Sequence, residues 1–270
     1  MIYKLDKNEL NLDEFGIKYG FMDGSIDFNP AGHAYESARK EFLNIVDEDF
    51  SYEVKQNHGI NINILDEKFK ENAKNRRNFF DNADADGVFT DQKGVALCIR
   101  TADCVPVLFA GFKGKTVAAA GAVHCGWKGA YGGIIKNAVS IMVNRFDIDA
   151  DAILALIGPS ICKKCYEVKE DFLNLFLNQN NLNINFFQQK IEAGKNKIFF
   201  DLKSFIKNEL VLNGLNGRNV FDINKCTMEN EDFFSYRRNK TDNRQVSFIS
   251  VSKKNLCCSI NESYRGFINQ

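Results

Sequence analysis

Histidine is scarce in this chain of 270 residues, which contains only His33, His58 and His124. A site that uses imidazole therefore has few candidate residues, and a centre that needs many histidines is excluded. Net charge is absent as well, because 35 lysine and arginine residues balance 35 aspartate and glutamate residues. That balance removes the overall attraction on which binding to nucleic acid or to an anionic membrane depends.

Long apolar runs are also missing. No segment approaches the roughly 18 apolar residues that a membrane span requires. The first ten residues, MIYKLDKNEL, are charged and lack the apolar stretch of a secretory signal. We therefore expect a soluble cytoplasmic protein, whose eight cysteines are mostly reduced thiols and include candidate metal ligands.

Strand-like and helix-like segments alternate through the chain without a repeat or a linker. Apolar runs predict strands at 94–99, 104–111, 116–124, 152–160, 197–202 and 245–252. Helical spacing follows in 130–146, 165–179 and 203–214, the last ended by Gly214. Pro106 favours an edge or bulged position for the second strand. The pattern predicts one α/β or α+β domain with mixed sheets over residues 1–270.

Three residues that can ligate a metal stand at strand ends beside turns. His58 follows a strand-like run, Cys104 comes directly after Asp103 in RTADCVPV, and His124 ends a buried run. A His/Cys/His trio suits zinc, and three protein ligands leave a fourth position open for water or substrate. The spacing is not a local zinc signature, however, so a Cys104 that packs as a small apolar residue remains an alternative.

A glycine-rich turn, HCGWKGAYGG, follows His124. Its glycines permit close backbone approach ahead of a helix, and free N–H groups there, with Lys128, can bind phosphate. A tight turn packed under Trp127 is the alternative.

Two further segments carry candidate residues. Arg237, Arg238 and Arg244 lie among aromatic residues, where they can grip phosphate and a base, or can form a solvated basic loop. Cys162-x-x-Cys165 lacks a thioredoxin-like setting, and we interpret these cysteines as structural or incidental.

The motifs QNHG, ADGVFTD, TADCVPVL, AVHCGWKG, IGPSI…CYEV, FDL and CT…FFSYRR occur in the order of a known family. Over roughly residues 50 to 250 the chain resembles the laccase-domain family, also called polyphenol-oxidase-like or the peptidoglycan editing factor family. The resemblance implies a single-domain mixed α/β sandwich flanked by helices. It also implies a zinc site formed by His58, Cys104 and His124.

The resemblance implies activity on purine nucleosides. The reactions are phosphorolysis of adenosine, inosine and guanosine, cleavage of methylthioadenosine, and deamination of adenosine. The expected partners are therefore nucleosides and phosphate, with no nucleic acid and no membrane, and the expected assembly is a monomer or a homodimer. Three positions depart from the family: Cys125 replaces alanine, Lys128 replaces arginine, and Met22 stands near an arginine position.

Roles for the remaining candidates follow from their chemistry. Asp103 is expected in the catalytic set, and Asp103 or Asp86 would orient a metal ligand or carry a proton. Asp86, Lys128 and Arg237 are the candidate contacts to substrate and phosphate. Because Cys125 adjoins His124 on a strand, its side chain should point to the opposite face.

Competing functions make different demands on the chain. A multicopper oxidase needs more imidazoles than three, although His/Cys/His can hold a single copper in vitro. A Cys–His hydrolase or amidase would use Cys104 as nucleophile and His124 as base, and would survive chelation. A non-catalytic factor in the editing of cell-wall precursors would turn over no nucleoside.

Overall fold

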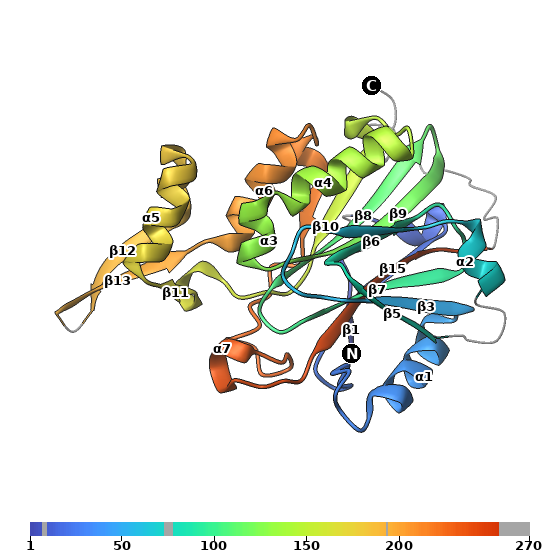
Figure 1. Cartoon of the computed structure of the whole chain (residues 1–270), viewed down its shortest axis with the longest axis horizontal. Coiled ribbons are helices and arrows are strands. Elements are labelled where there is room, and N and C mark those ends of the chain that lie inside the picture. Colours follow the sequence, from blue (N-terminus) through green and yellow to red (C-terminus); the bar gives the residue numbers. More distant parts are fainter. Residues whose placement is uncertain (7–9, 73–77, 193, 254–270) are drawn as a thin grey trace.

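The computed structural model describes residues 1–6, 10–72, 78–192 and 194–253. Figure 1 shows two large sheets between helices, with a smaller sheet and one helix projecting to one side. This arrangement confirms the mixed α/β class with sandwiched sheets and flanking helices. The prediction of one domain over 1–270 includes residues 254–270, which lie outside the described residues, and it stays a prediction.

Both large sheets are mixed. The first has the order β1 (Ile2–Tyr3), β2 (Ile17–Met22), β15 (Gln245–Val251), β7 (Val95–Thr101), β3 (Phe50–Lys55) and β5 (Asn78–Asp84). The second has the order β14 (Val220–Asp222), β10 (Ile153–Ile157), β8 (Val105–Lys113), β9 (Thr116–Cys125), β6 (Gly87–Thr90) and β4 (Ile62–Leu65). β3 pairs in parallel with β5 and β7, while β10 with β14 and β4 with β6 form parallel pairs in the second sheet.

The projecting sheet has the order β11 (Glu167–Val168), β13 (Lys195–Phe200) and β12 (Phe187–Glu192). The helices are α1 (Tyr35–Val46), α2 (Glu67–Asn72), α3 (Trp127–Gly132), α4 (Ile134–Ser140), α5 (Glu170–Gln179), α6 (Leu202–Leu212) and α7 (Tyr236–Asn239). None of the helices in the described part of the chain is both long and apolar enough to cross a bilayer.

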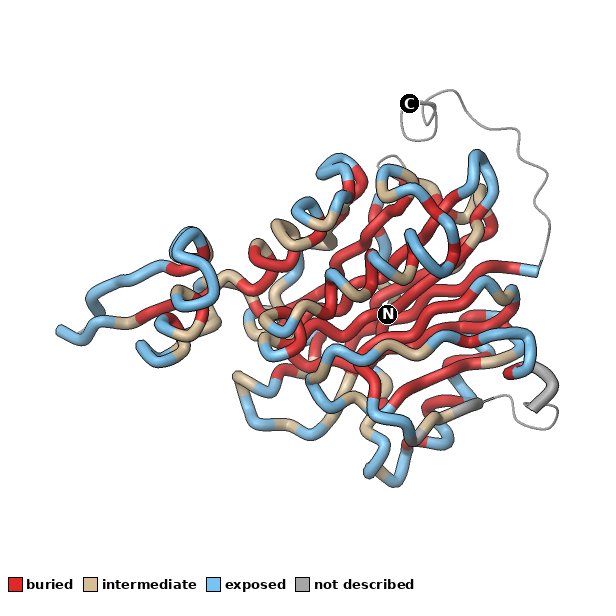
Figure 2. The backbone as a smooth tube through the Cα atoms, turned by 45° about the horizontal axis from the view of Figure 1, so that its top comes forward, coloured by how far each residue is buried: buried red, intermediate tan, exposed pale blue. Residues whose placement is uncertain are grey.

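Strand alternation creates three apolar layers. On β8, Val107 and Phe109 face α4 and α6, whereas Leu108 and Ala110 face the first sheet. A third cluster lies between the first sheet and α1. Figure 2 shows the buried strands at the centre and a largely exposed projection. The layer order is therefore helices, second sheet, first sheet and α1, because neighbouring side chains on a strand point to opposite faces.

Three local predictions were wrong in detail. β8 lies between β10 and β9, so it is not an edge strand; its register with β9 does shift between Gly111 and Phe112, but Pro106 itself is in regular register. The proline is tolerated because it is the second residue of β8 and pairing with β10 begins only at Val107. The helix predicted over 130–146 is split at Gly133, which has φ 94. The helix predicted from 165 begins at Glu170, because β11 pairs with β13 first.

The predicted end of α6 is confirmed. The helix stops at Leu212, and Gly214 adopts φ 105. The N–H of Gly214 donates to the carbonyl of Val211, and that of Leu215 donates to the carbonyl of Leu210. A left-handed glycine just beyond the last turn is the expected helix ending.

Candidate metal centre

The fold brings His58, Cys104 and His124 together. Their ligand atoms all lie within 4.8 Å of one another, and the Cys104 Sγ is 3.8 Å from the His58 Nε2. His58 follows β3, Cys104 precedes β8, and His124 is near the end of β9. His124 is buried, Cys104 is half-buried and His58 is exposed, so solvent reaches the group mainly at His58.

Asp86 organises two of the three residues. Its fully buried carboxylate accepts a hydrogen bond from the His124 Nδ1 at 2.6 Å. It also accepts backbone N–H bonds from Asn57, His58 and Gly59. Burial alone would raise the pKa of Asp86, but the bonds from His124 and the loop lower that pKa below its usual value. An ionised carboxylate can only accept, so the His124 Nδ1 donates its proton to Asp86, and the Nε2 is the nitrogen that ligates a metal once it has given up its own proton.

Strained backbone accompanies the candidate ligands. His58 has φ 63 and Asp103 has φ 92, both in the left-handed region that non-glycine residues rarely occupy. The strain at His58 is offset by the three N–H bonds to Asp86. At Asp103 it is offset by bonds from the Thr227 hydroxyl and the Arg237 N–H, each 2.6 Å long, to the carboxylate oxygens. Such strain gathers where side chains are held for function.

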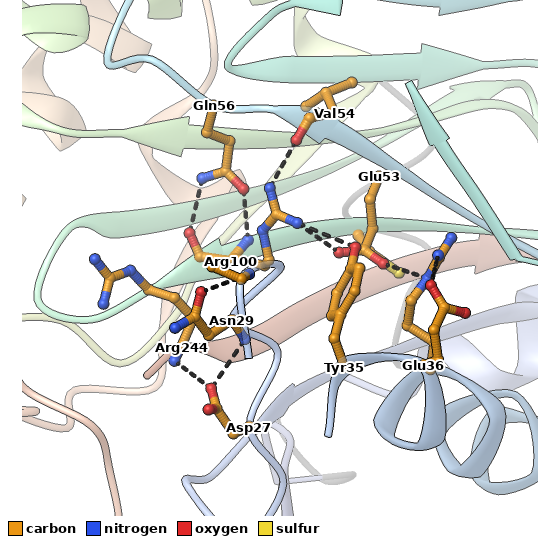
Figure 3. A network of polar contacts seen from close by, with 12 residues as sticks. Asp27, Asn29, Tyr35, Glu36, Glu53, Val54, Gln56, Arg100 and Arg244 are labelled. Carbon is orange, nitrogen blue, oxygen red and sulfur yellow. Dashed lines mark hydrogen bonds and ion pairs between the residues drawn. The ribbon is translucent and has the colours of Figure 1, made fainter. Parts of the chain in front are cut away.

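Gln56 ties the His58 loop to the strand before Cys104. Its amide group donates to the Arg100 carbonyl and accepts from the Arg100 N–H. Figure 3 shows this pair of hydrogen bonds beside the buried Arg100 guanidinium. The guanidinium donates hydrogen bonds to Glu53, Tyr35 and the Val54 carbonyl. The glutamine belongs to the QNHG motif, and its position in that motif was the only signal in the sequence for this role.

The glycines of the predicted anion turn serve close packing. A Cβ on Gly126 would lie 2.7 Å from the His58 Cδ2 and 3.3 Å from the Cys104 Sγ. A Cβ on Gly129 would lie 2.6 Å from the Gly59 carbonyl oxygen. Lys128 is exposed, with its Nζ 5.8 Å from the centroid of the Trp127 ring. The structure thus supports the packing alternative for this turn.

Replacing Gly126 by alanine should lower the affinity of the centre for zinc by about 10-fold or more, since the new methyl group displaces two ligands. Competition with a chromophoric chelator measures that affinity. Gly217→Ala is the matched control, because a Cβ there meets only a Val211 methyl at 3.8 Å. Equal zinc affinity in the two variants would contradict the close contact.

Cys125 points away from the centre. It is fully buried among Val105, Val123 and the helix-facing residues of β9. Strand alternation predicted this orientation. The thiol is therefore not among the grouped ligand atoms, although it adjoins His124 in sequence.

Cys104 and His124 influence each other's ionisation. Burial would raise the pKa of the Cys104 thiol, but the His124 charge and hydrogen bonds to both histidines lower it to about 6. Burial would lower the pKa of His124, but the Cys104 thiolate and Asp86 raise it to about 9. In the metal-free protein the thiolate is thus the main form at neutral pH, as metal binding requires.

The rate at which Cys104 is alkylated in the metal-free protein should depend on pH as this low thiol pKa requires. Because only the thiolate reacts, we expect the rate with iodoacetamide to fall as the pH drops through 6. Above that pH the rate should be nearly constant. Peptide mass spectrometry locates the modified residue, and Cys104→Ala removes the signal. A rate that keeps rising through pH 9 would contradict the stabilised thiolate.

A cavity of about 880 Å³ opens over the trio. Aromatic residues on its wall are Phe80, Trp127, Tyr166 and Tyr236, and the cationic residues are Lys55, Arg100, Arg237, Lys240 and Arg244. Its volume is in the range of small-molecule sites. Rings can stack on a planar base, and cations can bind an anion.

The predicted substrate contacts are distributed unevenly around this cavity. Arg237 lines it, lies 5.1 Å from the Tyr166 ring centroid and donates to the Glu167 carbonyl. Lys128 and Asp86 are not among the lining residues. Arg238 is used internally, since its guanidinium donates to the carbonyls of Thr227, Met228, Asn230 and Phe233. Met22, near the family's arginine position, is buried in the core.

Comparison with known proteins places these features in context. Residues 29–252 match the model of a family described as multi-copper polyphenol oxidoreductase laccase. The chain is 35% identical over 155 residues to a purine nucleoside phosphorylase of Rickettsia prowazekii, covering 57% of this chain and 60% of that protein. It is 30% identical over 186 residues to an adenosine deaminase from an unknown prokaryotic organism, covering 68% of each.

A solved structure shares the fold. The crystal structure of the hypothetical protein YfiH of Bacillus licheniformis superposes with a TM-score of 0.76 at 24% identity. The match covers 90% of this chain and 94% of the other.

Proposed function

The chain belongs to the multi-copper polyphenol oxidoreductase laccase family, and from this and its site geometry we propose that it is a zinc-dependent enzyme of purine nucleosides. The proposed reactions are phosphorolysis of adenosine, inosine, guanosine and methylthioadenosine, and deamination of adenosine. The observation that carries the proposal is the grouping of His58, Cys104 and His124 in a cavity with aromatic and cationic walls. The names of the similar phosphorylase and deaminase support it.

The donor set fits zinc. Zinc–nitrogen and zinc–sulfur bonds in a tetrahedral site place an N and an S ligand about 3.6 Å apart. The Cys104 Sγ and His58 Nε2 are 3.8 Å apart. Copper oxidase chemistry fits poorly, because several coppers need more imidazoles than this chain has, and His33 is exposed outside the trio.

The chain's own residues set up the chemistry around the metal. When bound, a zinc ion with an open position supplies a Lewis acid that polarises an oxygen or acidifies a water. Asp86 keeps the His124 Nδ1 protonated and its ring fixed. Both carboxylate oxygens of Asp103 accept bonds from other loops, so we assign Asp103 to positioning Cys104 and Arg237.

In phosphorolysis a phosphate oxygen bonds to C1′ of the ribose while the bond from C1′ to the purine breaks. The cationic wall would bind the anion, and the aromatic wall would hold the base. In deamination, water adds at C6 of adenine and ammonia leaves. The two reactions share the need for a bound purine beside the trio.

The presence of a second imidazole, that of His58, beside the Cys104 thiol argues against a Cys–His hydrolase. Asp86, His124 and Cys104 alone would form an acid–base–nucleophile series. His58 has no place in that series, yet its Nε2 faces the Cys104 Sγ. As a third metal ligand its position is explained.

The decisive experiment incubates metal-analysed protein with each nucleoside, with and without phosphate, and separates products by chromatography. Free base that appears only with phosphate supports phosphorolysis, and inosine from adenosine supports deamination. Both should stop on chelation and return with zinc. Turnover that survives chelation but not thiol alkylation would favour the hydrolase, and no turnover by zinc-replete protein would favour a non-catalytic role.

Arg237 is the residue we expect to contact phosphate. Arg237→Gln should raise the KM for phosphate by about 10-fold, because the variant loses one charge-assisted hydrogen bond to the anion. Lys128→Gln removes a nearby exposed charge that does not line the cavity, and serves as the matched control. Steady-state kinetics with varied phosphate measure the difference. A larger effect at Lys128 than at Arg237 would reverse the assignment.

A further inference from the structure

A second group of metal-ligating side chains lies outside the trio. It consists of Cys162, Cys165, Cys226 and Glu229, whose ligand atoms all lie within 4.8 Å of one another. The three cysteines are free thiols and partly buried, and Glu229 is exposed. No residue of this group belongs to the proposed catalytic centre.

The fold places these residues together through backbone contacts. β10 and β14 are parallel neighbours, so the segments that leave their carboxyl ends run side by side. A bridge between Ser160 and Cys226 prolongs the pairing. The Cys162 N–H donates to the Cys226 Sγ at 3.4 Å. Two strand ends that are distant in sequence therefore deliver thiols to one point.

Local turns complete the group. The Cys165 N–H donates to the Cys162 carbonyl at 3.0 Å, which closes the Cys-x-x-Cys turn. The Asn230 N–H donates to the Cys226 carbonyl, and this turn places Glu229 beside the thiols. The Glu229 Oε2 is 3.7 Å from the Cys162 Sγ. Main-chain hydrogen bonds thus position the three cysteines and the turn that carries Glu229.

We propose that Cys162, Cys165, Cys226 and Glu229 hold a structural zinc ion. Three thiolates and one carboxylate supply a closed set of four, the mark of a structural site rather than a catalytic one. A disulfide would use only two of the three thiols. Positive charge offsets the anionic ligands, because the Lys164 Nζ lies 2.7 Å from the Glu229 Oε1 and Lys163 and Lys225 adjoin cysteines.

The ion would lock two loops that hold Asp103. Ile161, next to Cys162, donates its N–H to the Asp103 carbonyl at 3.0 Å. Thr227, next to Cys226, donates its hydroxyl to the Asp103 carboxylate. Because Asp103 directly precedes Cys104, this zinc site would stabilise the loop that carries one ligand of the catalytic centre.

Metal counting tests the proposal. The full chain is purified in reductant, equilibrated with Zn²⁺, desalted and measured by elemental mass spectrometry. We expect two zinc ions per chain in the wild type, one in Cys162→Ser, one in Cys104→Ala and none in the double variant. Cys98→Ala removes a buried thiol outside both groups and should keep two. Because each site is counted separately, failure of the nucleoside activity does not affect this result.

Two further measurements guard against a variant that fails to fold. Glu229→Gln changes an exposed side chain and should weaken zinc retention against a chelator by about 10-fold or more. In the Cys104→Ala background, chelation should lower the melting temperature, because only the structural ion remains. One zinc in the wild type with no change in Cys162→Ser would overturn the proposal. A disulfide found among these cysteines in protein that is kept in reductant would also overturn the proposal.

Discussion

Replacing Cys104 by alanine should reduce turnover of purine nucleosides by more than about 10²-fold. Even groups that only orient metal ligands contribute 10- to 100-fold to affinity or activity, and Cys104 is itself one of three proposed ligands. Its Sγ lies within 4.8 Å of a ligand atom of each histidine. Loss of the thiolate leaves two imidazoles, one of them exposed, which hold zinc weakly.

Activity and bound zinc should be measured on the same preparation of the Cys104→Ala variant. Cys125→Ala is the matched control, since it removes a neighbouring thiol that faces the apolar core. The control should keep zinc and most of its activity. A Cys104→Ala protein with wild-type kcat/KM would refute the metal centre. A variant that keeps its zinc but loses activity would favour the nucleophile role of the hydrolase alternative.

Replacing Asp86 by asparagine should cost both stability and metal affinity. The carboxylate accepts four hydrogen bonds within a fully buried site. An asparagine amide has one acceptor oxygen, and its NH₂ group cannot accept. At least one buried donor then loses its partner, which costs about 1–3 kcal/mol. Because the His124 ring is no longer held, zinc affinity should fall by 10- to 100-fold.

Denaturant unfolding of the metal-free protein measures the first effect, and chelator competition measures the second. Asp84→Asn is the control, because Asp84 is an exposed carboxylate that pairs with Lys55 at 3.0 Å. Its substitution should change stability by well under 1 kcal/mol. If Asp86→Asn binds zinc as the wild type does, Asp86 does not orient His124.

The identity of the candidate ligands could be predicted because scarcity narrowed the choice. Only three histidines exist, and the motifs around His58, Cys104 and His124 resemble a known family over roughly residues 50 to 250, within the range 29–252 that the family model matches. Strand patterns were also readable, since alternation along β8 and β9 depends on neighbouring residues alone. For the same reason the opposite directions of His124 and Cys125 could be predicted.

The sequence left more than one role open for each of the other candidates, because each role depends on a distant partner. Asp86 was predicted either to orient a metal ligand or to contact substrate, and the hydrogen bonds that its carboxylate accepts from His124 and the 57–59 loop support the first role. Lys128 is next to Trp127, which lines the cavity, yet Lys128 itself is exposed and is not a lining residue. Charge and sequence position do not determine which way a side chain faces when several segments converge.

The cysteine motif illustrates the same limit. The sequence argued against a redox role for Cys162-x-x-Cys165 and left the two cysteines as structural or incidental, because two thiols alone do not make up a metal site. Cys226 lies more than sixty residues away, and only the parallel pairing of β10 with β14 brings it to the motif. The sequence by itself indicated the strands β7, β8, β9, β10, β13 and β15, the candidate ligands and the family that the chain resembles, because these depend on local pattern. Only the tertiary structure showed which groups surround Asp86, Gly126 and the second cysteine group, because sheet order brings distant segments into contact.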